Sequence, residues 1–169
     1  MAARLAQQNA AVKCVVRLSV LLVLCGCAVR RDTTRPWVGT WRLIAVESLD
    51  SASGVWRRPF GDQPSGYVVY GADGLHTMNF TRMPAPPAFV SGTDRGATES
   101  ELRQAFEGYF SWFGRYAVNR EGGTITHHIE GSLWPTWRNT MQVRPFVIRG
   151  DTLLLGDPVK SRRVLVRVR

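Results

Sequence analysis

Residues 37–47 read WVGTWRLIAVE, and this stretch decides the fold of the chain. It is rich in β-branched and aromatic residues, a composition that favours a β-strand. Gly39 has no side chain, so another segment can lie close to the backbone at that point. Trp41 follows two residues later and shares a face of the strand with Gly39. We therefore predict that the folded domain begins with a strand at about residues 38–48.

Short β-prone segments separated by turns occupy most of the remaining chain. Gly71-Ala72-Asp73-Gly74 separates two of them, and Asp-Gly between β-prone runs is a strong hairpin signal. In the run after this turn, His76, Met78 and Phe80 share one face, which we expect to point inward. Further strands are predicted at 55–60, 67–70, 75–81, 115–119, 124–132, 137–148, 152–155 and after Asp157-Pro158. A total of about 8–10 strands suits a closed antiparallel barrel, which leaves no exposed sheet edge.

One segment carries a helical pattern. Thr98-Glu99-Ser100-Glu101 is a capping box, with Thr98 as the N-cap and Glu101 three residues on. The apolar residues that follow recur at helical spacing, namely Leu102, Ala105, Phe106, Tyr109, Phe110 and Phe113. Gly114 suits the C′ position. We expect one amphipathic α-helix whose aromatic face is buried on the barrel wall or in a barrel mouth.

The first strand also carries a family resemblance. Gly39-Thr40-Trp41 resembles the Gly-x-Trp signature of lipocalins and other calycins, in which the tryptophan closes one barrel end and a late arginine covers it. The resemblance implies that role for Trp41 and, on the last strand, for Arg167. Segments 59–70, 108–116 and 126–137 look like the bacterial and fungal lipocalin-like domain family, and HHIEGSLWPTW at 127–137 is the most specific of them. The resemblance covers about residues 37–169 and implies a mainly β, closed antiparallel lipocalin-like barrel without one settled activity.

The first 26 residues resemble an export signal. Basic residues without any acid precede a nine-residue apolar run, Leu18 to Gly26, which is far short of the roughly 20 residues that a spanning helix needs. Leu24-Cys25-Gly26-Cys27 resembles a bacterial lipobox, so we expect Cys27 to be the acylated N-terminus and residues 27–36 to be a tether. Because Ala28 is not aspartate, the resemblance implies an outer-membrane lipoprotein facing the periplasm. The alternative is a cleaved signal without a lipid.

Composition and charge narrow the function further. The chain has 169 residues, is 44% hydrophobic and carries a net charge of +9, so we expect a globular domain with a real core. The basic residues are mostly scattered arginines without a nucleic-acid motif, and nucleic acid is not predicted as a partner. Their one cluster, Lys160 to Arg163, is interpreted as a basic rim at a barrel end; an anionic membrane surface or an acidic ligand is the next possibility. No cofactor is predicted.

The segment from Thr124 to Trp137 is the best site candidate. Alternation on a strand places His127 with Ile125 and Ile129 on the interior face. An interior histidine could move a proton near neutral pH, but we favour a structural histidine bonded to a tyrosine or a backbone carbonyl. His128 and Glu130 are expected as an outer-face pair. A metal site is not predicted, because adjacent strand residues point opposite ways.

Flat aromatic side chains with polar tips suit a ligand pocket. We expect the cavity to be lined by Tyr67, Tyr70, His76, Met78, Phe80, His127, Ile129, Trp134, Trp137 and Arg144. If the interior polar set includes both Glu130 and Arg144, their ion pair would fix an acidic or carbonyl ligand.

Three functions are compatible with these features. The preferred one is a lipid-anchored periplasmic barrel that binds a small hydrophobic or amphiphilic ligand, since small barrels of about eight strands have room for one. The second is an isomerase or cyclase that uses His127 as its acid or base. The third is a structural envelope lipoprotein with a filled barrel and no ligand.

Overall fold

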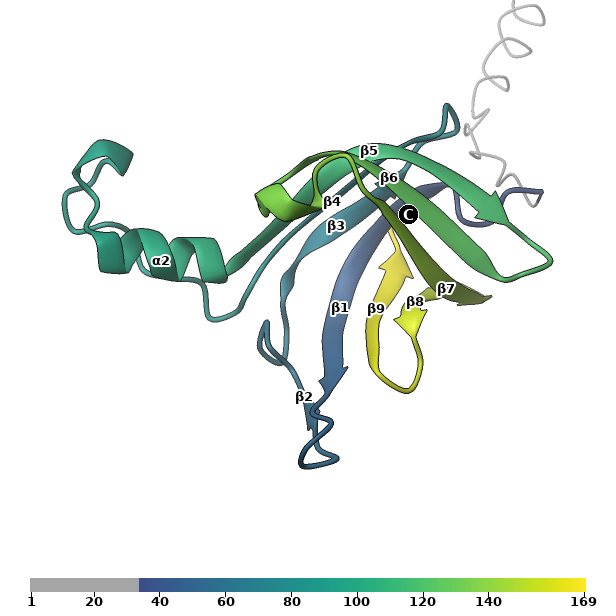
Figure 1. Cartoon of the computed structure of the whole chain (residues 1–169), viewed down its shortest axis with the longest axis horizontal. Coiled ribbons are helices and arrows are strands. Elements are labelled where there is room, and N and C mark those ends of the chain that lie inside the picture. The colour runs from purple at the N-terminus through teal and green to yellow at the C-terminus, as the bar shows by residue number, and fades with distance from the viewer. Residues whose placement is uncertain (1–33) are drawn as a thin grey trace, which may run out of the picture. The chain divides into compact units, whose positions relative to one another are not determined.

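The computed structural model describes residues 34–169, which form one closed antiparallel β-barrel (Figure 1). Within that range the strands are β1 Gly39–Leu49, β2 Trp56–Arg57, β3 Ser65–Tyr70, β4 Leu75–Thr81, β5 Tyr109–Asn119, β6 Thr124–Ser132, β7 Met141–Arg149, β8 Thr152–Asp157 and β9 Ser161–Arg167. Each strand from β3 onward pairs with the next, and β1 pairs with both β3 and β9. The short β2 pairs only with Ser48 and Leu49 at the end of β1. The predicted closed barrel is therefore confirmed, while the export signal and Cys27 lie outside the described residues.

Arg167 and Trp41 close one end of the barrel, where they pair across β1 and β9. The guanidinium carbon of Arg167 lies 4.1 Å from the centroid of the Trp41 ring, a cation–π contact. The same guanidinium donates hydrogen bonds to the carbonyls of Val38, at 2.9 Å, and Pro36. A Cβ on Gly39, whose φ is +132°, would stand 2.9 Å from Nη1 of Arg167. The glycine is needed because the arginine occupies the space beside it.

Alternation along the strands, interrupted by a register shift in β1 between Leu43 and Ala45, fills the barrel with side chains. His76, Met78 and Phe80 on β4 point inward and are buried, as predicted, whereas Thr77 and Asn79 face outward. The buried apolar core comprises Trp37, Trp41, Leu43, Val46, Val68, Tyr70, Met78, Phe80, Phe110, Trp112, Ile125, Ile129, Leu153, Leu155 and Leu165. We use the term distal end for the end of the barrel away from Trp41 and Arg167, where β4 ends and β5 begins.

The helix differs from the prediction at its C-terminus. Its start is confirmed: α2, Glu99–Glu107, has Thr98 as N-cap in a complete capping box. However, it ends at Gly108, and Tyr109 already begins β5, so the predicted continuation to Phe113 is wrong. As part of a strand, the aromatic residues at 110 and 112 both point into the barrel. Seven residues of β5 also pair with β4, and this pairing stabilises the strand more than one further helical turn would stabilise α2.

The predicted burial of the helix is also wrong. No residue of α2 is buried, and Leu102 and Phe106 are 49% and 44% exposed. In Figure 1 the helix extends away from the strands beyond the start of β5. A short 3₁₀ turn, η1 Asp94–Gly96, precedes it. No helix in the described part of the chain is long and apolar enough to cross a membrane.

The segment before β7 turns instead of extending. Pro135–Trp137 forms the 3₁₀ turn η2, and Asn139 adopts a positive φ of 61°. The predicted strand at 137–148 therefore begins only at Met141. Proline at the first helical position favours such a turn, since it has no N–H to contribute to a sheet. The turn directs Trp134 and Trp137 toward Phe110 at the distal end of the barrel.

Candidate functional site

A hydrogen-bonded tyrosine–histidine pair lies at the centre of the barrel. Nε2 of His127 is 2.8 Å from the hydroxyl of Tyr70, and Nδ1 is 3.2 Å from the carbonyl oxygen of Gln142. A carbonyl can only accept, so we assign the ring proton to Nδ1, and the Tyr70 hydroxyl donates to Nε2. Both side chains are fully buried. Burial, followed by the neighbouring His76, lowers the pKa of His127 to about 3. The ring is therefore neutral at physiological pH, with both nitrogens engaged.

His76 packs against this pair from β4. Its ring centroid lies 4.8 Å from that of His127 and 6.2 Å from Trp112. Neither ring nitrogen makes a hydrogen bond with residues 34–169, although both are enclosed. Burial is the main reason that the pKa of His76 falls to about 4. Within the same residues, no three histidine, cysteine or acidic side chains are placed to hold a metal ion.

Glu130 faces the outside of the barrel, as the alternation on β6 requires. Its carboxylate lies 3.6 Å from Arg115 on β5, and both side chains are more than half exposed. Arg144, in contrast, lies among inward-facing residues of β7. The interior Glu130–Arg144 ion pair that we considered from the sequence is therefore excluded, since the two side chains are on opposite faces of the wall.

Two arginines, one on β7 and one on β9, point into the barrel interior. Arg144 donates from Nη2 to the side-chain oxygen of Gln142 at 3.2 Å. Arg163 is paired across the sheet with Val46 and Leu155, which are both buried core residues. Its guanidinium carbon lies 5.6 Å from the Phe110 ring centroid. The cluster Lys160 to Arg163 is thus not a simple basic rim, because its last arginine points inward.

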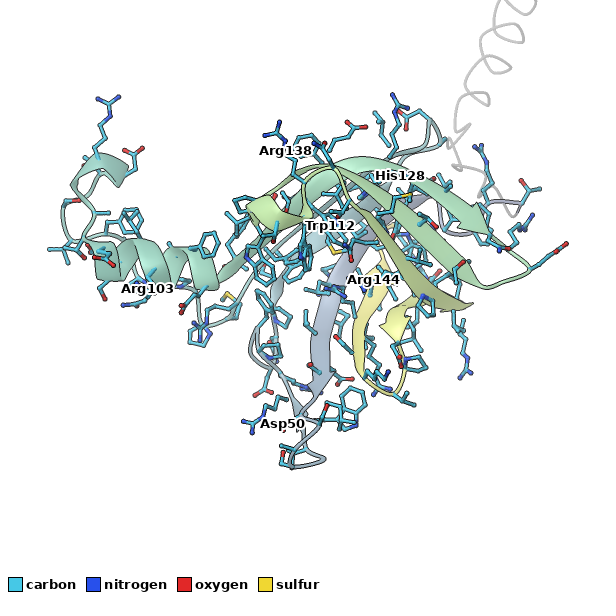
Figure 2. The ribbon with its side chains drawn as sticks, in the orientation of Figure 1. Asp50, Arg103, Trp112, His128, Arg138 and Arg144 are labelled. Carbon is cyan, nitrogen blue, oxygen red and sulfur yellow. The ribbon has the colours of Figure 1, made fainter. Side chains whose placement is uncertain are left out.

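A cluster of aromatic rings lies beside Arg163 at the distal end. Phe110 stacks on Phe80 with 4.7 Å between the ring centroids, and Trp134 and Trp137 meet it edge-on at 6.0 and 5.7 Å. Figure 2 shows Trp112 and Arg144 among the strands, whereas His128 and Arg138 lie at the outside. Trp137 and Arg144 are partly buried, and Trp134 is 37% exposed. The interior is therefore less completely covered here than around His127.

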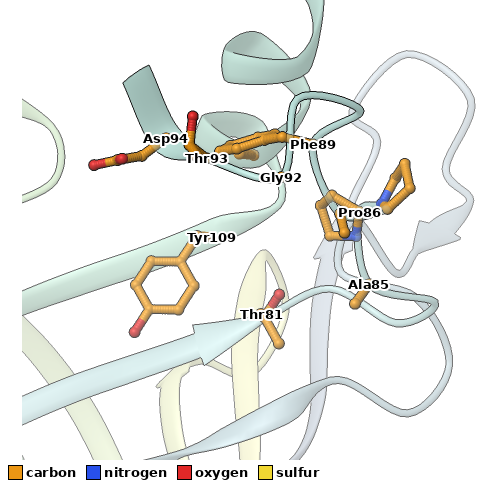
Figure 3. Close-up of a pocket in the computed structure, with 11 residues that line it drawn as sticks. Thr81, Ala85, Pro86, Phe89, Gly92, Thr93, Asp94 and Tyr109 are labelled. Atoms are coloured by element: carbon orange, nitrogen blue, oxygen red, sulfur yellow. The ribbon is translucent and has the colours of Figure 1, made fainter. Parts of the chain in front are cut away.

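A separate pocket of about 570 Å³ lies outside the barrel. Figure 3 shows Phe89 and Pro86, from the loop before α2, around it together with Tyr109 of β5. Thr81 and Tyr109 belong to the outward faces of their strands. None of the ligand residues predicted from the sequence lines this pocket.

Comparison with known proteins agrees with this geometry. Residues 38–164 match the family model described as a lipocalin-like domain. The chain belongs to the lipocalin-like domain family. The chain is also similar to the 4'-hydroxy-3'-methoxypropiophenone carrier protein of Aspergillus oryzae, with 36% identity over 74 residues. That match covers 40% of this chain and 62% of the fungal protein, so it spans less than two thirds of the relative.

The lipocalin-like barrel brings most of the predicted ligand residues onto its inner face. Tyr70, His76, Met78 and His127 are buried at the centre; Phe80, Ile129 and Trp137 lie nearer the distal end, and Trp134 lies at its rim. Arg144 points inward from β7, opposite Ile125. Tyr67 is the exception. It is 50% exposed on the outer face, because it alternates with Val68 and Tyr70.

Sequence reasoning missed several interior residues of the lipocalin-like barrel, Phe110 and Arg163 among them. Phe110 was assigned to the helix, so its place in the distal aromatic cluster was not predicted. Arg163 was assigned to a basic rim, although alternation from Leu165 places it on the interior face. Counting by twos from that buried leucine would have identified it.

Proposed function

We propose that this lipocalin-like protein binds a small apolar or amphiphilic molecule at the distal end of its barrel. The proposal rests on a difference in side-chain exposure between the two ends of the barrel. Arg167 covers Trp41, which is 0% exposed, at one end, whereas at the other end Trp134 is 37% exposed and Trp137 is only partly buried. Partly covered aromatic rings beside donors are typical of small-molecule sites.

The similarity to a carrier protein supports the same proposal. The name of the fungal relative specifies a methoxylated aromatic ketone. A flat ring of this kind could stack against Phe110 and Trp137, which already pack edge-to-face with 5.7 Å between centroids. We therefore take an aromatic ligand as the first class to test.

Binding can be tested with phenylnaphthylamine, an uncharged aromatic probe whose fluorescence rises in apolar surroundings. Trp137→Ala should weaken its binding about tenfold, because an aromatic contact surface is lost. Trp56→Ala is the matched control, since Trp56 lies on β2 and is 40% exposed on the outside. Circular dichroism should confirm that both variants fold. Equal affinity in both variants would contradict a site at the distal end.

The filled centre of the barrel favours one alternative, a structural lipoprotein without a ligand. Tyr70, Trp112 and His127 are all 0% exposed, so a guest has no access there without rearrangement. The probe titration separates the two functions, as does native mass spectrometry of protein purified from its host. No specific observation favours catalysis, because both nitrogens of His127 are committed to hydrogen bonds.

Membrane attachment is the second part of the proposal. We expect Cys27 to carry the lipid and to hold the barrel at the outer membrane, facing the periplasm. The support comes from the lipobox-like sequence Leu24-Cys25-Gly26-Cys27. A Cys27→Ala variant should move from the membrane to the soluble periplasmic fraction, whereas a Cys14→Ala control should not. An unchanged distribution of the Cys27 variant would overturn the lipid anchor.

A further inference from the structure

The interior of the barrel holds positive charge without compensating acid. Arg144 on β7 and Arg163 on β9 are separated by one strand, β8, and both point inward. Neither makes an ion pair with any residue in the range 34–169, and the Nε atom of each is enclosed without a hydrogen-bond partner. A partly buried cation in this situation is costly unless an anion or water compensates it.

Arginines on the outer face, unlike the two interior ones, have acidic partners. Arg162, the immediate neighbour of Arg163, lies 2.8 Å from Glu47, which also pairs with Arg58 at 3.2 Å. Arg115 likewise has Glu130 as its outward partner. The carboxylates of Glu47 and Glu130 thus pair with arginines on the outer face of the barrel. Their arrangement leaves the two interior cations without a counterion from the described chain.

The groups around the two arginines are neutral and cannot supply the missing charge. Burial holds the pKa of Tyr70 well above its usual range, and burial keeps His127 uncharged. Burial, followed by the positive charge of Arg144, lowers the pKa of Arg163 to about 10. Both arginines nevertheless remain protonated near neutral pH. The barrel interior around Arg144 and Arg163 is therefore a positive region in apolar surroundings.

The N–H donors of Arg163 have no acceptor among the described residues. Phe110 lies against its guanidinium at 5.6 Å, so one face of the group is covered. Its terminal Nη atoms make no hydrogen bond with the described residues and are not fully enclosed. Planar guanidinium groups bind carboxylates and similar oxyanions with two parallel hydrogen bonds.

We infer that Arg144 and Arg163 form an anion-binding subsite, and that the ligand of this barrel is a small apolar or aromatic acid. Its carboxylate, or an equivalent oxyanion, lies between the two guanidinium groups, and its apolar part lies against Phe110 and Trp137. This inference rests on the proposed binding function and specifies the class of ligand.

Two fluorescent probes with the same aromatic framework test the subsite. Anilinonaphthalene sulfonate carries an anionic group that phenylnaphthylamine lacks. The wild-type protein should bind the sulfonate at least about tenfold more tightly, because charge-assisted hydrogen bonds are the strong ones. Arg163→Met and Arg144→Met should each reduce that preference about tenfold. The affinity for the uncharged probe should stay within about twofold of the wild-type value.

Matched variants make the result specific. Arg149→Met removes the same charge from the exposed outer face of β7 and should change neither affinity. Arg163→Lys retains the charge and should retain part of the sulfonate preference. Melting curves provide a second readout: Arg163→Met should be at least as stable as the wild type, because an unpaired cation is replaced by an apolar side chain of similar length.

The outcomes distinguish the inference from the function on which it rests. If the uncharged probe binds and depends on Trp137, but the sulfonate has no advantage or keeps it in both arginine-to-methionine variants, the anion subsite is wrong and barrel binding stands. If neither probe responds to Trp137→Ala, both proposals fall. A sulfonate preference that disappears only with the interior arginines supports both.

Discussion

The two buried histidines should make the stability of this protein sensitive to mild acid. Their pKa values fall from 6.5 to about 4 for His76 and about 3 for His127, chiefly through burial. Below pH 6.5 the unfolded chain takes up protons at both rings while the folded chain does not. Stability is therefore lost as the pH falls through 6.5, and the loss continues until the folded pKa values are reached.

The magnitude follows from the size of this proton uptake. Each ring should cost about 1.36 kcal/mol per pH unit once the unfolded form is fully protonated. Between pH 7.5 and 5.0 this amounts to about 2 kcal/mol for each histidine and about 4 kcal/mol for the two together. The result in this window is insensitive to the folded pKa values, since both lie below it. Carboxylates with lowered pKa values, such as Glu47, lose their contribution mainly at lower pH.

Urea unfolding at a series of pH values, followed by tryptophan fluorescence, measures this effect. His76→Leu should roughly halve the loss of unfolding free energy between pH 7.5 and 5.0, because one titrating ring is removed and no hydrogen bond to the described residues is broken. Thr126→Val is the control on the outer face of β6; it removes no titratable group and should leave the pH dependence unchanged. A His76→Leu variant with the wild-type pH dependence would refute the reasoning.

Two further substitutions test the closure and the centre of the barrel. Arg167→Ala removes a cation–π contact and hydrogen bonds to backbone carbonyls, so the free energy of unfolding should fall by about 2–4 kcal/mol in urea titrations. Arg169→Ala, whose side chain is 81% exposed, should leave it nearly unchanged. Tyr70→Phe removes the hydrogen bond to His127 and should cost about 1–3 kcal/mol by thermal unfolding; an unchanged melting temperature would argue against that bond.

The segment 108–116 illustrates where sequence patterns are ambiguous. Its aromatic residues satisfy a helical period and a strand period at the same time, so the pattern alone could not place Phe110 and Phe113. The structure places the first inside and the second outside, where it is 54% exposed. The deciding factors are Gly108, which caps α2, and the partner strand β4, which is distant in sequence. Cross-strand pairing is a tertiary property that no local window contains.

The interior charges illustrate the same limit at the candidate site. Alternation assigned His127 to the interior and Glu130 to the outside, and both placements hold. It could not show that Tyr70, 57 residues earlier, would lie 2.8 Å from the histidine. Nor could it show that Arg144 and Arg163 would reach the same interior without an acid between them, since that depends on which strands become neighbours.

The sequence by itself determined most of the strands, the hairpin at Asp73-Gly74, the start of the helix and the family, because these depend on local backbone preference and on short motifs such as Gly39-x-Trp41. Only the tertiary structure decided where the helix ended, that the barrel centre is filled, and which side chains meet inside it. The physical reason is that burial and pairing are set by closure of β1 on β9, which brings together residues more than a hundred positions apart.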